Sequence, residues 1–493
     1  MTQPTQRVTL NGYDRILILI FILTLPLVNP WVRGDGVGYY AYARAIVVNH
    51  NLQFEPDWLR ANPSFYLGRI DALGHLRADQ YTRTGHLDNH FTIGPALIWI
   101  PFLAVTHAVV LGVDHLGARI PTDGFSWPYI DTMAFVTALA GFVGLFLSFR
   151  LARKYFSEHW AFLATLGIWF ASSLLVYMYF NPSWSHAHSA FIVALFLWYW
   201  DRTRATRTVG QWAVLGLIAG LMLDVYYPNA LFLLVVFVEL AITATRILRS
   251  RLSTETCEFR TLVLGSCVFA AALIFAFFPT LVSRWIIYGS PFSTGYTEVG
   301  VWRLTNPLLG QVLFSSDHGL FSWTPILFLA SAGLLLVVRR DRVLGCAIVF
   351  SALAFYFLIA TYPDWDGISS YGNRFFVSLT PVFILGLTAL LAASERLVRN
   401  SRVAWQGAIA GVALLVLWNF GLLFQWGMHL IPDRGPISWS EMASNQFRVV
   451  PVDLSSSVAR YFTRRHQMMQ TIEKRDLRQL GKNEPKANEK QQP

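Results

Sequence analysis

An acidic residue stands just outside the first apolar run, in the sequence Gly34-Asp35-Gly36. The flanking glycines let the backbone turn, which would place the Asp35 carboxylate at the edge of a membrane. At that depth a carboxylate could take the proton of an acceptor hydroxyl or amine while a sugar leaves a lipid phosphate. Tyr39 and Tyr42 follow at helical spacing and predict a helix along the membrane surface. The alternative is a solvated turn beside an interfacial aromatic belt.

Several basic residues could hold a phosphate beside this carboxylate. Arg374 begins an apolar run, and its guanidinium could bind a lipid phosphate through two parallel hydrogen bonds. The alternative is an interfacial arginine that extends to the lipid headgroups. His318 and Arg284 are further candidates for the same phosphate. His90 could contact that phosphate or cap the helix that follows it.

Two histidines, His186 and His188, flank one alanine at the start of a later apolar run. Two imidazoles at this spacing in a turn could bind one metal ion, or donate hydrogen bonds to a phosphate. A divalent ion would need further oxygen ligands, and Asp35 is the nearest candidate by type. The alternative is a pair of neutral histidines at the end of a span.

The composition is that of a polytopic membrane protein. Of 493 residues, 54% are hydrophobic, 15% aromatic and only 14% charged. Many apolar runs approach the length of about 20 residues that crosses a bilayer. The net charge of +10 does not indicate nucleic-acid binding, because most Lys and Arg residues lie in short loops between apolar runs. The cysteines Cys257, Cys267 and Cys346 are scattered and predict neither a disulfide framework nor a thiolate metal site.

The basic loops predict the sidedness of the spans, because Lys and Arg mark the cytoplasmic side. Basic clusters occur at Arg150–Lys154, Arg202–Arg207, Arg246–Arg260, Arg339–Arg342 and Arg396–Arg402. All can be cytoplasmic together only if the apolar stretch Phe91–Gly112 does not cross the membrane. Its Pro95, Pro101 and His107 fit a juxtamembrane or re-entrant helix. If the stretch did cross, the first cluster would lie outside.

The sequence therefore predicts an all-α polytopic membrane protein with about eleven transmembrane helices. Residues 1–430 would form the transmembrane domain, with a large first outer loop at 33–128 that contains juxtamembrane helices. Residues 431–493 would be a tail, of which about the last 25 residues lack fixed structure by composition. The expected spans are Ile16–Val32, Tyr129–Phe149, Ala161–Phe180, Ala187–Trp200, Gln211–Asp224, Asn229–Thr245, Leu262–Trp285, Phe321–Val338, Val343–Ala360, Phe375–Ala393 and Trp405–Gly427.

In this arrangement the polar residues gather in the outer loops, whereas the inner loops carry little except positive charge. The outer loops contain Asp317-His318-Gly319 and Asp364-Trp365-Asp366-Gly367 as well as Asp35. A transporter would place polar groups and broken helices near the middle of the bilayer. Polar chemistry on one face is more typical of an enzyme that acts at the membrane surface.

The order of several short motifs resembles the GT-C superfamily of integral membrane glycosyltransferases. The closer similarity is to its branch of protein O-mannosyltransferases and lipid A aminoarabinose transferases. The matching segments are Gly34-Asp35 with Tyr39 and Ala43-Arg44, then Asn89–Leu97, Tyr288–Pro291, Gly319–Pro325 and Tyr371–Phe375. The sequence departs from that branch at Gly36, where a second acidic residue is common. It departs again beside His90, where the double proline is missing.

The resemblance implies a GT-C core and a polyprenyl-phosphate sugar as donor, with inversion at the anomeric carbon. Asp35 would be the catalytic acid/base residue. Arg374, with His90 or His318, would hold the donor phosphate, and the acceptor would be a lipid, a glycan or a protein on the outer face. His186 and His188 fall where oligosaccharyltransferase relatives bind metal, so a divalent metal ion is a candidate cofactor, with none certain. The expected location is a bacterial inner membrane, with the site facing the periplasm.

Three other functions remain open at this point. A lipid-linked glycan polymerase or ligase would use the same face with an oligosaccharide donor. A flippase would move a lipid-linked sugar without releasing polyprenyl phosphate and would tolerate loss of the Asp35 carboxylate. A scaffolding membrane protein is the least consistent with Asp, His and Arg gathered on one face.

Overall fold

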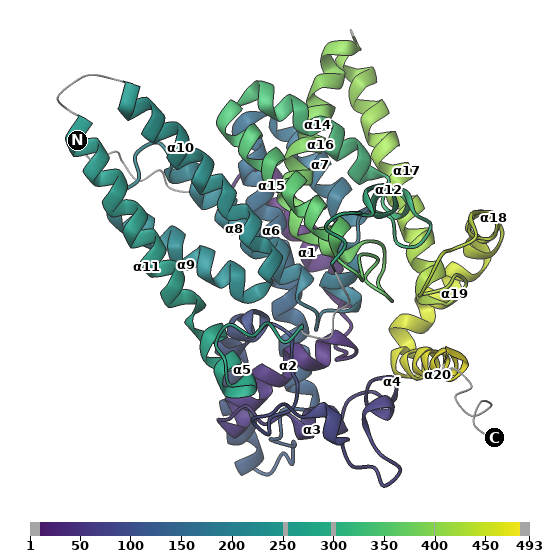
Figure 1. Cartoon of the computed structure of the whole chain (residues 1–493). Coiled ribbons are helices and arrows are strands. Elements are labelled where there is room, and N and C mark those ends of the chain that lie inside the picture. Colours follow the sequence, from purple (N-terminus) through teal and green to yellow (C-terminus); the bar gives the residue numbers. More distant parts are fainter. Residues whose placement is uncertain (1–9, 250–254, 297–301, 399, 484–493) are drawn as a thin grey trace.

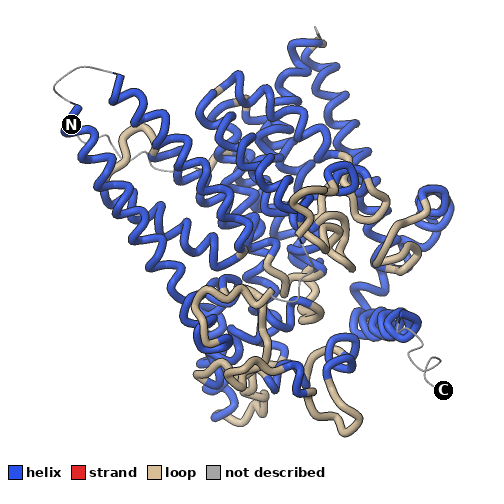
Figure 2. The backbone as a smooth tube through the Cα atoms, viewed as in Figure 1, coloured by secondary structure: helices blue, strands red, loops and turns tan. Residues whose placement is uncertain are grey.

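The computed structural model describes residues 10–249, 255–296, 302–398 and 400–483. Helices dominate these residues, and their only β pairing is two isolated bridges, Ile70–Leu76 and Tyr81–Leu87 (Figure 2). The prediction of an all-α membrane protein is confirmed.

The first half of the chain contains ten α-helices among the described residues. They are α1 (Gly12–Thr24), α2 (Asp35–Arg44), α3 (Glu55–Leu59), α4 (Pro63–Tyr66), α5 (Gly94–His115), α6 (Trp127–Tyr155), α7 (Glu158–Phe170), α8 (His186–Thr203), α9 (Val209–Val225) and α10 (Leu234–Arg249). In Figure 1, α6, α7 and α8 lie in the centre of the bundle, and α9 and α10 stand to one side of it.

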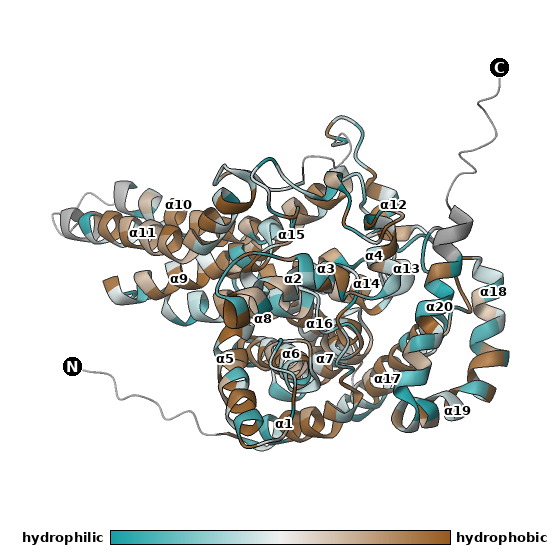
Figure 3. Cartoon of the chain, turned by 90° about the horizontal axis from the view of Figure 1, so that it is seen from below, coloured by the Kyte–Doolittle hydropathy of each residue, from teal (hydrophilic) through white to brown (hydrophobic). Residues whose placement is uncertain are grey.

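The second half completes the bundle and adds a helical C-terminal segment. Its described α-helices are α11 (Glu255–Tyr288), α12 (Leu309–Phe314), α13 (Leu320–Trp323), α14 (Ile326–Arg340), α15 (Arg342–Thr361), α16 (Thr380–Leu397), α17 (Ser401–Gly427), α18 (Trp439–Ser444), α19 (Val450–Thr463) and α20 (Arg465–Asn483). Helices α14 and α16 join the centre, α11 packs on α9, and α17 to α20 form the opposite flank (Figures 1 and 3).

Seven helical segments of the described chain are long and apolar enough to cross a membrane. They are Gly94–His115, Trp127–Tyr155, Tyr227–Arg246, Phe259–Tyr288, Arg342–Thr361, Arg374–Leu397 and Ser401–Gly427. Other expected spans, among them those in α1, α9 and α14, form shorter helices. The number of eleven crossings therefore remains a prediction.

Basic loops from distant parts of the sequence meet at one end of the bundle, which we call the basic end. Ion pairs there join Arg150 to Asp14, Lys154 to Asp201, and Arg204 to Asp341. The start of α1, the end of α6 and the α14–α15 turn consequently lie on the same side. Three of the clusters that the sequence assigned to one face are thus together, and the assignment of that face to the cytoplasm stays a prediction.

Helix α5 lies beside only the first part of α6, the part away from the basic end. Three side-chain hydrogen bonds join the two helices in antiparallel order: Trp99 to Thr137, Thr106 to Thr132, and His107 to Tyr129. Of the α6 residues in these bonds, Thr137 is the nearest to the basic end. It precedes Arg150 by 13 residues, which is about 20 Å along the helix. This packing is consistent with the predicted helix that does not connect the two faces, although α5 is long enough to span.

Close packing of α14 on α16 depends on two glycines that face each other. A Cβ atom at Gly333 would lie 1.9 Å from the carbonyl oxygen of Gly386, and one at Gly386 would lie 2.1 Å from that of Ala330. Real Cβ atoms cannot approach backbone so closely, so the two helices touch only because both positions lack side chains.

We expect Gly333→Ala to destabilise the protein by about 1–3 kcal/mol, because the new methyl group forces α14 and α16 apart. The matched control is Gly411→Ala in α17, where a Cβ would meet no atom within 4 Å. Thermal unfolding in detergent would measure both variants. Equal unfolding temperatures for Gly333→Ala and the control would contradict this account of the packing.

The C-terminal segment is helical up to Asn483. The sequence predicted that about the last 25 residues lack fixed structure, so the described part of that stretch differs from the prediction. The polar residues of α20 find partners on the outer loops. The Glu473 carboxylate accepts hydrogen bonds from the Ser64 backbone and the Asn62 side chain, and Asp476 pairs with Arg33. Composition alone misses such long-range contacts, which hold a polar helix in place. Residues 484–493 lie outside the described chain.

Candidate active site

Asp35 and Arg374 form an ion pair. Asp35 is the first residue of α2, and Arg374 begins the 3-10 turn Arg374–Leu379 that precedes α16. Nη1 of Arg374 lies 2.8 Å from Oδ2 of Asp35. The Asp35 side chain keeps 33% of its surface exposed and that of Arg374 only 11%. The expected base and the expected phosphate ligand therefore stand side by side, with the carboxylate the more accessible of the two.

The glycines on both sides of Asp35 are required by close contact with the loop between α7 and α8. Gly34 has a φ of +53°, and a Cβ there would lie 3.1 Å from the Trp184 ring. A Cβ at Gly36 would lie 1.9 Å from Oγ of Ser183. The indole Nε1 of Trp184 also donates to the carbonyl of Arg33, 3.0 Å away. These contacts fix the turn that presents the Asp35 carboxylate.

The guanidinium of Arg374 lies over the indole of Trp184, with Cζ 4.5 Å from the ring centroid. Its Nε is buried and makes no hydrogen bond within the described chain. The loop after α15 approaches the same atom, since a Cβ at Gly367 would lie 3.2 Å from it. A buried N–H group without a partner is costly, and a ligand oxygen would satisfy it.

His90 lines the same cavity as Asp35 and Arg374. Its ring packs between Phe91 and Tyr296, with centroids 4.3 and 5.0 Å away, and burial lowers its pKa. Arg284, the weaker phosphate candidate, donates instead to the carbonyls of Asn89, His90 and Phe91. Arg284 therefore positions the backbone at His90, while the His90 ring remains available to the cavity.

His186 and His188 are not brought together. They are in the first turn of α8, where His186 packs on Tyr177 with ring centroids 4.6 Å apart. His188 instead packs edge-on against Trp99, and its Nε2 lies 3.5 Å from Oγ1 of Thr137. Among the described residues, neither belongs to a cluster of three ligand-type side chains. Their arrangement does not fit a shared metal ion, and their use as ligands stays an untested prediction.

His318 is fully buried and lies outside the cavity lining that contains Asp35. Its ring packs on that of Trp323, with the ring centroids 4.8 Å apart, and its Nδ1 lies 3.3 Å from Oδ1 of Asp317. Burial, followed by the charge of Arg374, lowers the pKa of His318 to about 4. Burial and the nearby Asp366 carboxylate raise the pKa of Asp317 to about 6. Because His318 does not line the cavity, the structure does not support a direct contact between His318 and a donor phosphate bound there.

The cavity beside the ion pair has a volume of about 590 Å³. Its charged lining comes from four arginines and three aspartates, namely Arg33, Arg69, Arg374, Arg434, Asp35, Asp433 and Asp476. Much of the rest is apolar and comes from α17, α19 and α20, including Phe420, Phe424, Val458, Tyr461 and Met469. A pocket that combines arginine side chains with apolar walls suits an amphiphile that carries a phosphate.

Three contributors to this cavity were not identified from the sequence. Trp184 precedes the two histidines by only two residues, and its aromatic type beside a polar turn was the available signal. Arg69 lies in the first outer loop, where many charges made it inconspicuous. The C-terminal helices gave a weak signal in the amphipathic stretch Val449–Phe462, which did not indicate where they would dock.

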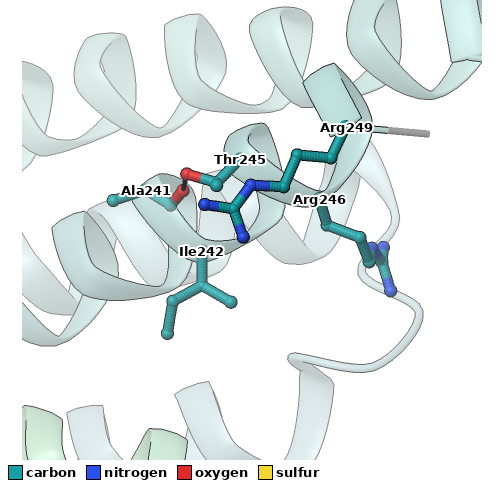
Figure 4. Close-up of a pocket in the computed structure, with 5 residues that line it drawn as sticks. All are labelled: Ala241, Ile242, Thr245, Arg246 and Arg249. Atoms are coloured by element: carbon teal, nitrogen blue, oxygen red, sulfur yellow. Dashed lines mark hydrogen bonds between the residues drawn. The ribbon is translucent and has the colours of Figure 1, made fainter. Parts of the chain in front are cut away.

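A second hollow, of about 660 Å³, lies on α10. Ala241, Ile242, Thr245, Arg246 and Arg249 line it (Figure 4). This lining holds no acid and no histidine, and its one hydroxyl, that of Thr245, donates to the carbonyl of Ala241. The cavity beside Asp35 is therefore the better candidate for catalysis.

Searches with the sequence find no matching family model and no matching curated protein. Solved structures do match. The oligosaccharyltransferase of Archaeoglobus fulgidus, crystallised with Zn and sulfate, is 15% identical with a TM-score of 0.51. The match covers 81% of this chain and 52% of that one, so this chain spans about half the length of that enzyme.

A second match is ArnT of Cupriavidus metallidurans, crystallised with undecaprenyl phosphate. It is 15% identical with a TM-score of 0.48, and the match covers 94% of this chain and 74% of that one. The likeness to the oligosaccharyltransferase shows the fold, which is the GT-C fold that the sequence predicted.

Proposed function

We propose that this protein is a membrane glycosyltransferase that moves a sugar from a polyprenyl-phosphate donor to an acceptor. The observation that carries the proposal is the Asp35–Arg374 pair beside a cavity with long apolar walls. The GT-C fold supports it, because one solved structure that shares this fold is an oligosaccharyltransferase.

The pair suggests how donor binding prepares the base. In the free protein the Arg374 guanidinium is engaged by Asp35, 2.8 Å away. A donor phosphate offers a second anionic partner to the same guanidinium, including its unpaired Nε. When Arg374 also binds the phosphate, its ion pair with the Asp35 carboxylate becomes weaker. The Asp35 carboxylate is then a better proton acceptor while the donor is bound.

The transfer itself would be a single displacement. The acceptor oxygen or nitrogen forms a bond to the anomeric carbon, and the bond from that carbon to the phosphate oxygen breaks. The acceptor proton passes to Asp35, and the electron pair leaves with polyprenyl phosphate, whose charge Arg374 stabilises. His90 lines the same cavity and would make a further contact with the phosphate or the sugar.

We place this reaction on the outer face of the membrane, in a bacterial inner membrane. The support is the basic end of the bundle, which gathers Arg150, Lys154 and Arg204. By the positive-inside rule this end would face the cytoplasm. The cavity, which opens beside α2 and the first outer loop, would then face the periplasm.

The test is release of polyprenyl phosphate from a panel of labelled polyprenyl-phosphate sugars by the purified protein in detergent. Release that requires an acceptor would support a glycosyltransferase and would identify the donor. Movement of labelled lipid across a vesicle membrane without release would instead support a flippase. Products that contain many sugars would support a polymerase or ligase with an oligosaccharide donor.

A further inference from the structure

A buried histidine and two carboxylates from separate loops converge next to the Arg374 loop. Asp317 and His318 lie in the turn between α12 and α13, and Asp366 lies in the loop between α15 and Arg374. One ligand atom from each of the three lies within 4.8 Å of the others. The sequence separation of about 50 residues means that only tertiary folding brings them together.

His318 supplies a second and independent observation. Its side chain is fully buried, and neither ring nitrogen makes a hydrogen bond within the described chain. Its Nδ1 nevertheless lies 3.3 Å from a carboxylate oxygen of Asp317. Buried polar groups are normally satisfied, so an imidazole with two unused nitrogens beside carboxylates indicates a missing partner.

The charges at this place indicate that the partner is a cation. No Lys or Arg of the described residues forms an ion pair with Asp317 or Asp366. The other cluster of metal-ligand type, His429 with Asp433 and Asp476, differs because Arg33 already pairs with Asp476. The first cluster therefore has an uncompensated negative charge that a divalent ion would offset.

We propose that Asp317, His318 and Asp366 bind one divalent metal ion. Ligand atoms about 2.1 Å from a shared ion lie about 3.0–3.5 Å apart, so the three groups need to close by at most about 2 Å. One imidazole with two carboxylates suits Zn²⁺ or Mn²⁺ better than Ca²⁺, which prefers oxygen ligands alone. Water would complete the coordination of the ion.

The ion would connect two loops and fix the position of Arg374. Gly367 follows Asp366 directly, and a Cβ there would lie 3.2 Å from Nε of Arg374. An ion on Asp366 would thus hold this part of the loop against the guanidinium. This positioning role rests on the proposed function, whereas the metal site itself does not.

The experiment measures metal bound to the full-length protein in detergent, with no sugar donor present. The protein is stripped with chelator, dialysed against micromolar Zn²⁺ or Mn²⁺, desalted, and analysed by elemental mass spectrometry. We expect the wild type to retain about one ion per chain, and Asp366→Asn and His318→Gln to bind the ion at least 10-fold more weakly. Asp364→Asn, on the same loop but outside the cluster, is the matched control and should retain the ion.

Two results would overturn the proposal. One is a wild type that retains no ion. The other is equal retention of the ion by the wild type and by Asp366→Asn. Asp366 is only half-buried, so its variant keeps the test valid if His318→Gln fails to fold. Because the readout contains no transfer step, metal retention without sugar transfer would refute the proposed function and leave the metal site standing.

Discussion

Asp35→Asn should reduce sugar transfer by about 10³-fold, within the usual range for the loss of a general base. The amide keeps the size of the carboxylate but cannot accept the acceptor proton. The turn should survive, since Gly34 and Gly36 and their contacts with Ser183 and Trp184 are unchanged. Polyprenyl phosphate release, followed at saturating donor and acceptor, is the measurement.

The control for this variant is Asp79→Asn. Asp79 also belongs to an Arg–Asp ion pair in the first outer loop, but it is 61% exposed and does not line the cavity. Its variant should release polyprenyl phosphate at the wild-type rate. Polyprenyl phosphate release by Asp35→Asn within twofold of the wild-type rate would remove Asp35 from the chemistry.

Arg374→Ala should lower kcat/KM for the donor by about 10²–10³-fold, the effect expected when a buried charged hydrogen-bond partner of a ligand is removed. Both binding of the donor phosphate and stabilisation of the leaving phosphate depend on this guanidinium, so KM should rise and kcat should fall. Arg374→Lys should recover only part of the loss, because an ammonium group cannot donate two parallel hydrogen bonds.

The matched control is Arg77→Ala, which removes the partner of Asp79 at the protein surface. It should leave the donor kinetics unchanged, and both variants should elute from size exclusion as the wild type does. An unchanged KM and kcat in a well-folded Arg374→Ala would show that the donor phosphate binds elsewhere. Arg69 and His90, which line the same cavity, would then be tested next.

The placement of the two histidines depends on the local backbone, which their spacing alone does not specify. In a turn, two imidazoles two residues apart can converge, as the prediction of a metal site at His186 and His188 requires. The structure begins α8 at His186. On a helix, residues two apart point about 200° away from each other, which explains why one ring meets Tyr177 and the other Trp99.

The helical membrane class of this protein could be predicted from its sequence. Long apolar runs require backbone hydrogen bonding within each segment, so they must be helices. Their ends were less predictable: the span expected at Ala161–Phe180 forms the α-helix α7 only over Glu158–Phe170. The place of the Asp35 turn followed from two glycines next to an apolar run. The common end of several basic loops followed from the distribution of Arg and Lys.

The assembly of the site, in contrast, depends on tertiary contacts. The fold pairs Asp35 with Arg374, encloses Arg374 against Trp184, and docks α19 and α20 as a wall of the cavity. These contacts join segments that are hundreds of residues apart. They depend on which helices pack together and at what distance, and local propensity and hydrophobic periodicity carry no information about either.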